Sequence, residues 1–272
     1  MVSTFIIALR EGLEASLIVG ILVAYIIKSE RRALLKPLWT GVAAAVLISI
    51  GLGFILSRTS AGLSPHSQAL FSGTTSIAAV ALVTWMVFWM KRSARFLKSE
   101  LHEKVDSASL IGPVALATTA FLAVIREGLE TSLFLYSNFK TVSDTRSSTI
   151  GLLIGFALSI SLGYLIYKST INLNLAKFFR YTGIALVVVA AGVLNYGIHE
   201  FQEIGWLPGG HSFAWDFSTQ IPSDSLTGVA LSGTVGFDAS TSWLQLGLWA
   251  LYLLSVLIPY LSKPRTRQLV SA

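Results

Sequence analysis

The sequence of 272 residues contains no cysteine and only three methionines. The absence of cysteine excludes a disulfide framework and any site built from thiolates. Copper(I) prefers thiolate and thioether ligands, so the scarcity of sulfur also argues against a copper(I) site. Charged residues are scarce as well, since Asp, Glu, Lys and Arg together make up 12% of the chain. Each charge inside an apolar stretch therefore needs an explanation.

Apolar residues dominate the composition. Hydrophobic residues make up 53% of the chain and the mean hydropathy is +0.69, values typical of a polytopic membrane protein. About 20 residues span the hydrocarbon core as a helix, so the length leaves room for about seven crossings. We therefore predict an all-α membrane protein. The expected helices lie near 4–27, 38–57, 68–90, 110–139, 149–167, 180–203 and 243–262.

One pentapeptide, Arg-Glu-Gly-Leu-Glu, occurs twice, at residues 10–14 and 126–130. Each copy supplies the only ionisable residues of a long apolar run. Ionisable residues inside a membrane helix mark a functional site by default. The neighbouring residues repeat at the same offset of 116 positions, which indicates a duplication. The flanking pairs are Phe5 and Phe121, Ser16 and Ser132, and Leu17 and Leu133.

The duplication predicts two inverted three-helix repeats. The second motif begins three helices after the first, so the two motif helices must cross the membrane in opposite directions. In transporters built this way the substrate site lies near the bilayer midplane, between the repeats. We expect one permease domain across 1–272. Its parts are repeat 1 (1–95), repeat 2 (108–205), an outer loop (206–242), a seventh helix (243–262) and a cytoplasmic tail (263–272).

Basic residues predict the orientation. Fifteen Lys and Arg residues fall in the connections after the first, third and fifth helices and in the C-terminal tail, against three on the opposite side. Basic loops stay in the cytoplasm, so the N-terminus is expected outside and the C-terminus inside. The net charge of +6 reflects this asymmetry, and it gives no support to nucleic-acid binding.

The spacing within the motif places its charges on one helix face. The two Glu residues are three apart, and the Arg precedes the second Glu by four. Gly between them lets another helix or an ion approach closely. If both copies face each other, four carboxylates and two guanidinium groups converge. Such a cluster needs a cation or protons, and hard oxygen donors suit hard cations. The expected metal ligands are Glu11, Glu14, Glu127 and Glu130, with Arg10 and Arg126 supporting them.

Three other interpretations of the motifs stay open. Arg10–Glu14 and Arg126–Glu130 can be structural ion pairs, although that would leave Glu11 and Glu127 without partners. The Glu residues can relay protons. The chain can also be a membrane subunit that only anchors another protein, which would leave four buried carboxylates unexplained.

At these motifs the sequence resembles the oxidase-dependent iron transporter family, which carries Arg-Glu-x-x-Glu in its first and fourth membrane helices. The resemblance extends to residues 84–90 and 173–175, and it is closest to the bacterial seven-helix branch of iron permeases. It implies inward transport of iron across the cytoplasmic membrane, with the motif Glu residues contacting the ion.

The resemblance also implies how iron is supplied. Family members are associated with oxidation of ferrous iron by a separate protein, so Fe³⁺ would be the transported form and an extracytoplasmic oxidase the partner. We expect no permanently bound cofactor and no enzymatic activity. Related proteins are associated with other ions, so lead or manganese is an alternative substrate. The oligomeric state is left open.

A second acidic group closes the sixth expected helix, where His199, Glu200 and Glu203 face the predicted outer side. His199 and Glu203 share a helix face. They form either an outer site that gathers the cation or an ordinary polar helix end. A metallohydrolase using His199 and Glu200 is a weak alternative, because zinc proteases of that kind need a second His at position 203.

Overall fold

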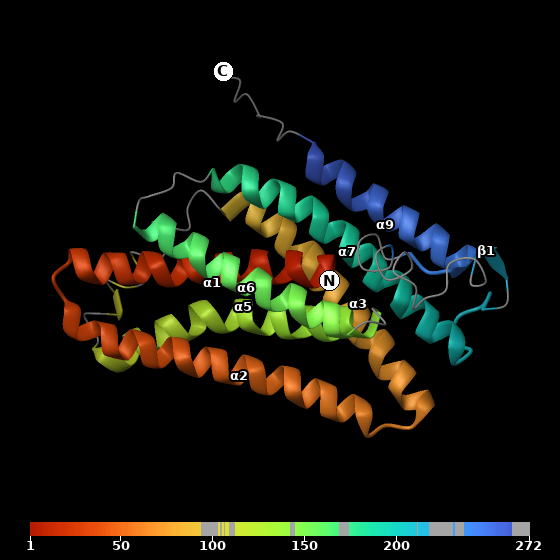
Figure 1. Cartoon of the computed structure of the whole chain (residues 1–272), viewed down its shortest axis with the longest axis horizontal. Helices are drawn as coiled ribbons and strands as arrows, with labels where there is room; N and C mark the ends of the chain where they lie inside the picture. The colour runs from red at the N-terminus through yellow and green to blue at the C-terminus, as the bar shows by residue number, and fades with distance from the viewer. Residues whose placement is uncertain are drawn as a thin grey trace, which may run out of the picture.

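The computed structural model describes residues 1–93, 103, 105, 107–108, 112–141, 145–168, 174–210, 212–217, 231 and 237–262. Long helices dominate this part of the chain (Figure 1). The expected helices are all present, with ends shifted by a few residues. They are α1 (Val2–Lys28), α2 (Leu35–Ala61), α3 (Pro65–Ser93), α5 (Pro113–Thr141), α6 (Thr145–Tyr167), α7 (Leu175–Glu203) and α9 (Trp243–Leu261).

Five of these helices, α2, α3, α6, α7 and α9, are long and apolar enough to cross a membrane. The other two, α1 and α5, have 27 and 29 residues and so are long enough as well. Each carries the three charged residues of one motif, which raises its polarity. All of these charged residues except Arg126 are buried inside the bundle. The chain is therefore an all-α, multi-pass membrane protein.

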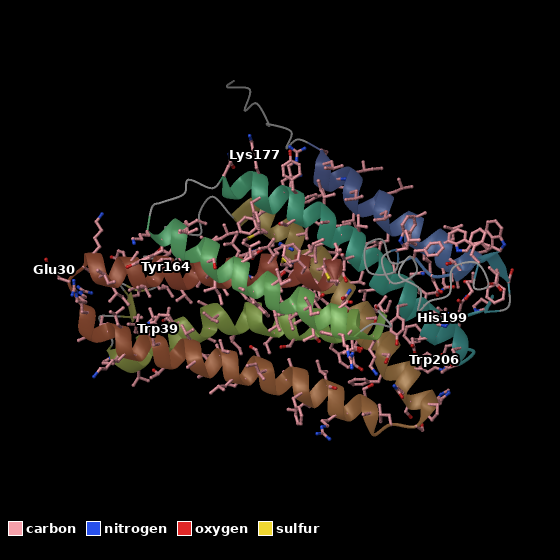
Figure 2. The ribbon with its side chains drawn as sticks, viewed as in Figure 1. Glu30, Trp39, Tyr164, Lys177, His199 and Trp206 are labelled. Carbon is pink, nitrogen blue, oxygen red and sulfur yellow. The ribbon has the colours of Figure 1, made fainter. Side chains whose placement is uncertain are left out.

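The two ends of the bundle differ in what they hold. The end of α7 and a short two-stranded hairpin lie at one end, here called the hairpin end, and the start of α1 is the part of α1 that is nearer to it (Figure 1). The opposite end, here called the basic end, holds the turn between α1 and α2. Figure 2 shows His199 and Trp206 at the hairpin end, and Glu30 and Trp39 at the basic end.

The motif helices α1 and α5 run in opposite directions, as predicted. Ser3 near the start of α1 donates a hydrogen bond of 2.9 Å to Asn138 near the end of α5. Conversely, Ile26 at the end of α1 belongs to the same apolar cluster as Leu116 at the start of α5. The exact repeat boundaries, 1–95 and 108–205, remain predictions.

Helices pair across the two predicted repeats. The most extensive contacts join α1 to α6, α2 to α5 and α3 to α7, while α1 and α2 barely touch. Thus the first helix of each repeat packs along the second helix of the other (Figure 1). The two repeats are interlocked rather than placed side by side.

Matched glycines and serines lie where α1 packs on α6 and where α5 packs on α2, here called the two seams. A side chain at Gly12 of α1 would meet Ser159 of α6, and one at Gly128 of α5 would meet Ser49 of α2. Missing side chains of this kind let helix backbones approach closely in membranes. Two further glycine contacts are repeated between the two helix pairs. Gly151 lies against Met1 as Gly41 lies against Ala117, and Gly163 lies against Ser16 as Gly53 lies against Ser132.

The stretch 206–242, expected as loop, contains two short strands among its described residues. Strand β1 (Phe213–Asp216) pairs antiparallel with β2 (Ser240–Ser242). Ser242 then caps α9, because its side chain accepts from the Gln245 backbone while the Gln245 side chain accepts from the Ser242 backbone. The hairpin thereby fixes the start of α9. The tail 263–272 lies outside the described residues.

Candidate metal site between α1 and α5

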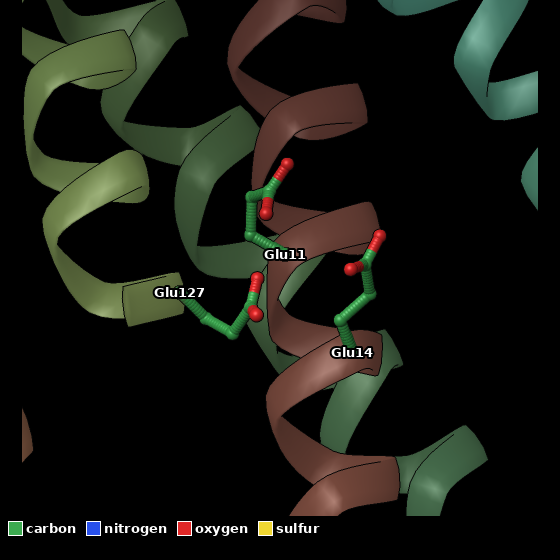
Figure 3. Close-up of side chains that lie close together, drawn as sticks. All are labelled: Glu11, Glu14 and Glu127. Atoms are coloured by element: carbon green, nitrogen blue, oxygen red, sulfur yellow. The ribbon is translucent and has the colours of Figure 1, made fainter. Parts of the chain in front are cut away.

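Three motif carboxylates converge at the centre of the bundle. Glu11 and Glu14 of α1 and Glu127 of α5 each offer an oxygen, and these oxygens lie within 4.8 Å of one another. Figure 3 shows Glu127 turned toward the two carboxylates of α1. All three residues are at most 5% exposed. Among the described residues they form the only group of three or more candidate metal ligands this close together.

Arg10 lies against the two carboxylates of its own helix. Its Nε is 3.2 Å from Glu14 Oε1, as the spacing of four residues predicted, and its Nη1 is 3.8 Å from Glu11 Oε1. The expectation that Glu11 would lack a basic neighbour is therefore wrong. A third atom of the guanidinium, Nη2, is 2.6 Å from Met86 Sδ on α3. Arg10 is 1% exposed, so the group is sealed inside protein.

Arg126 occupies a more open position. Its Nε donates to Glu130 Oε1 at 3.0 Å, which confirms the predicted pair. Its guanidinium carbon lies 4.0 Å from the centroid of a Trp89 ring and 5.3 Å from that of Trp85. The Arg126 side chain is nevertheless 31% exposed. Glu130 stays with Arg126 and is outside the group of three close carboxylates.

The carboxylates have bonding capacity that the described protein atoms do not fill. Both oxygens of Glu11, Oε1 of Glu14, and Oε2 of Glu127 and Glu130 are buried without a hydrogen-bond partner. Arg10 offsets part of this charge through its ion pairs with Glu11 and Glu14, but buried carboxylate oxygens that accept no hydrogen bond are costly. Four carboxylates against two guanidinium groups leave an excess of about two negative charges if all ionise. A hard cation bound by these oxygens would remove both problems.

Gly12 and Gly128 serve helix packing. Each sits one residue after a motif Glu and faces a serine of the neighbouring helix. The sequence left open whether each glycine allows the close approach of another helix or of an ion. In the structure it is a neighbouring helix that approaches. It presses α1 onto α6 and α5 onto α2, which fixes the rotation of both motif helices. The carboxylates consequently point at each other.

Residues 1–266 match the iron permease FTR1 family. This chain belongs to that family. It is 35% identical over 264 residues to the "Ferrous iron permease EfeU" of Escherichia coli O6:H1, covering 96% of this chain and 95% of that protein. It is also 32% identical over 265 residues to the protein of the same name from Yersinia pestis, covering 96% and 94%. No solved structure matches this permease.

The acidic end of α7 in this permease is divided between two faces. His199 and Glu203 share an exposed face, as predicted. Glu200 is half-buried and hydrogen-bonds the Tyr196 hydroxyl one turn earlier. The three residues are not brought together as one close donor group.

Three contacts to the arginines escaped prediction. The sequence singled out Trp85, Met86 and Trp89 only through the family resemblance, yet they touch the two motif arginines from a single helix, α3. The available signal was that this segment, 84–90, is rich in aromatic residues and methionine and contributes to the family resemblance. Sequence spacing could not reveal which helix would face the motifs.

Proposed function

We propose that this iron permease moves iron inward through the carboxylate cluster between α1 and α5. Glu11, Glu14 and Glu127 hold the ion, and Glu130 completes the ligand set when the ion passes. Arg10 and Arg126 keep the cluster from becoming too acidic between ions. The convergence of three buried carboxylates with unpartnered oxygens carries this proposal.

Iron crosses as Fe³⁺ in this proposal. The relatives are named for ferrous iron, and a separate oxidase outside the membrane would convert it before passage. The membrane potential favours inward movement by roughly 2.3 kcal/mol per charge per 100 mV, or about 7 kcal/mol for three charges. Uptake measured with ferrous iron trapped by a chelator, and separately with ferric iron trapped, tests the valence.

The direction rests on the distribution of basic residues. Lys28, Arg31, Arg32, Lys36 and Lys91 lie at the basic end, which we place in the cytoplasm. The hairpin end then faces outward, with the N-terminus, and the permease sits in the cytoplasmic membrane. Labelling of single cysteines by a membrane-impermeant reagent tests this, because the natural chain has none to interfere.

The interlocked helices constrain how the site changes access. A rocking of one whole repeat against the other would separate α1 from α6 and α2 from α5 at once. The narrower interface between α1 and α5, where the carboxylates meet, is easier to open. We therefore place the movement there, with each cross-repeat helix pair staying together.

The decisive experiment is uptake of radiolabelled iron by iron-starved cells expressing matched amounts of protein. We expect Glu14→Gln combined with Glu127→Gln to lower uptake by roughly ten-fold or more. Glu30→Gln, an exposed carboxylate at the basic end, is the matched control and should behave as wild type. Wild-type uptake by the double variant would show that the motifs are structural ion pairs. Competition by lead or manganese in the same assay tests the substrate.

A further inference from the structure

An apolar layer separates the carboxylate cluster from the hairpin end. One turn beyond Arg10 and Glu130 in that direction, Ile7 and Phe134 meet side chains from α3 and α7 around a small cavity. Among the described residues its lining is entirely apolar. A site of this kind stays dry, so an ion cannot wait there. The remaining lining residues are Ala79, Val80, Val83, Leu186, Val189, Ala190 and Val193.

Beyond this layer the buried side chains become polar again. The Tyr196 hydroxyl hydrogen-bonds the Glu200 carboxylate, and Ser72 Oγ is buried without a hydrogen-bond partner. Tyr136 of α5 is 7% exposed, and its hydroxyl has no hydrogen-bond partner. Ser76 Oγ and Asn195 Oδ1, on the same stretches of α3 and α7, are buried without partners too. Unpaired buried hydroxyls cost free energy, so this region is built for something to bind.

Three helices bring these groups together. A side chain at Gly197 of α7 would lie 3.1 Å from Ser76 Cβ, which shows how closely α7 approaches α3 here. The Phe71 ring, next to Ser72, packs edge-on against Tyr136 with centroids 5.9 Å apart. Two phenols, one carboxylate and one hydroxyl therefore come from the facing stretches of α3, α5 and α7.

We propose that Tyr136, Tyr196 and Glu200, with Ser72, form a second iron site on the hairpin side of the apolar layer. Phenolate and carboxylate oxygens are hard donors that suit Fe³⁺. Each phenol that binds as phenolate releases one proton to the water outside. The ion waits at this outer tyrosine site until the layer opens toward Glu11. The inference rests on the proposed function, because it concerns the same route.

Charged neighbours tune this site. Lys140 lies 5.9 Å from the Tyr136 ring centroid and within electrostatic reach of Glu200. Its ammonium offsets part of the negative charge of Glu200. His199 and Glu203 also act on Glu200 from α7. They stay exposed, so they attract the cation rather than enclose it.

The purified permease titrated with Fe³⁺, supplied as a weak chelate, provides a direct spectroscopic test. Phenolate bound to Fe³⁺ gives a visible charge-transfer absorption, whereas carboxylates alone do not. We expect the band in the wild type and in the combined Glu14→Gln and Glu127→Gln variant. We expect it to disappear in Tyr136→Phe combined with Tyr196→Phe. Tyr252→Phe is the matched control, because that hydroxyl contacts Thr84 at 2.9 Å, away from the site.

Uptake by the same variants completes the test. The tyrosine variants should raise the KM for iron roughly ten-fold, with the maximal rate unchanged. A wild type without the band, or tyrosine variants with unchanged band and KM, would overturn the outer tyrosine site. Either result would leave central transport intact, since wild-type uptake is measured separately. Absence of uptake by the wild type would instead refute the proposed function.

Discussion

The two copies of the pentapeptide are identical in sequence but differ in their surroundings. Arg10 is 1% exposed and its guanidinium reaches the sulfur of Met86, whereas the Arg126 side chain is 31% exposed and lies over two indoles. Both arginines keep the ion pair that the spacing of four residues predicts. The duplication therefore determines the pairing, while the third helix determines what else each arginine contacts.

This difference follows from α3, which touches both motif helices with different residues. Met86 meets Arg10, and Trp85 and Trp89 on the adjoining face meet Arg126. Arg10 lies on the hairpin side of the cluster and Arg126 on the basic side. The sealed arginine thus belongs to the side that faces outward in our proposal, and the accessible one to the side where iron leaves. We infer that Arg126 is the arginine that moves when the ion is released.

Replacing either arginine singly should give the largest difference in stability between the two motifs. Arg10→Ala leaves Glu11 and Glu14 buried without their positive neighbour, so we expect a loss of about 3–5 kcal/mol in stability. Arg126→Ala removes a partly exposed pair and a cation–π contact, for a loss of about 1–2 kcal/mol. Thermal unfolding of both proteins in detergent measures this. Equal losses would mean that the difference in exposure has no energetic consequence.

The motif glycines should give the next largest effect. Gly12→Ala and Gly128→Ala each force a methyl group against a serine, for a cost of about 1–3 kcal/mol. Ser49→Gly should rescue Gly128→Ala, because its crowding comes chiefly from Ser49. Ser159→Gly should rescue Gly12→Ala only in part.

The reason for this unequal rescue is the Phe156 ring, which would still lie 2.9 Å from the new methyl group at position 12. Unfolding temperatures and iron uptake of the single and double variants provide the measurement. The serine variants alone are the controls. Complete rescue at both positions would show that the two seams are equivalent in energy as well as in sequence.

Trp89→Leu should have a smaller effect, confined to the second motif. Loss of the ring 4.0 Å from the Arg126 guanidinium removes a cation–π interaction worth about 0.5–2 kcal/mol. If Arg126 controls release, a less restrained guanidinium should also change the maximal uptake rate. Trp39→Leu, an exposed tryptophan at the basic end, is the matched control. An unchanged rate would separate Arg126 from the release step.

Periodicity and spacing predicted much of this molecule. The apolar runs predicted the seven helices, the step of three helices from the first motif to the second predicted their opposite directions, and the spacing of four predicted both ion pairs. These features depend on local geometry along one helix. The pairing of α1 with α6 and of α2 with α5 was not predicted, because it depends on contacts such as Gly12 with Ser159 that lie far apart in sequence.

The site itself was predicted only in part. Sequence symmetry suggested four equivalent carboxylates, yet Glu130 remains with Arg126 outside the group of three. Helix α3 differs at the two arginines as well, since Met86 lies at Arg10 while Trp85 and Trp89 lie over Arg126. Likewise His199, Glu200 and Glu203 formed one cluster in sequence, but the helix divides them between an exposed face and a half-buried one.

Met86→Leu should have the smallest effect of these changes. Methionine and leucine have similar volumes, so the swap should cost less than about 1.5 kcal/mol if Met86 mainly fills space beside Arg10. Uptake should then match that of the wild type, since thioether sulfur is a poor ligand for Fe³⁺. Unfolding temperature and uptake of this variant, compared with Met90→Leu four residues later, provide the measurement. A large loss at position 86 alone would show that Arg10 depends on the sulfur, and that the first motif is held by α3 as firmly as the second.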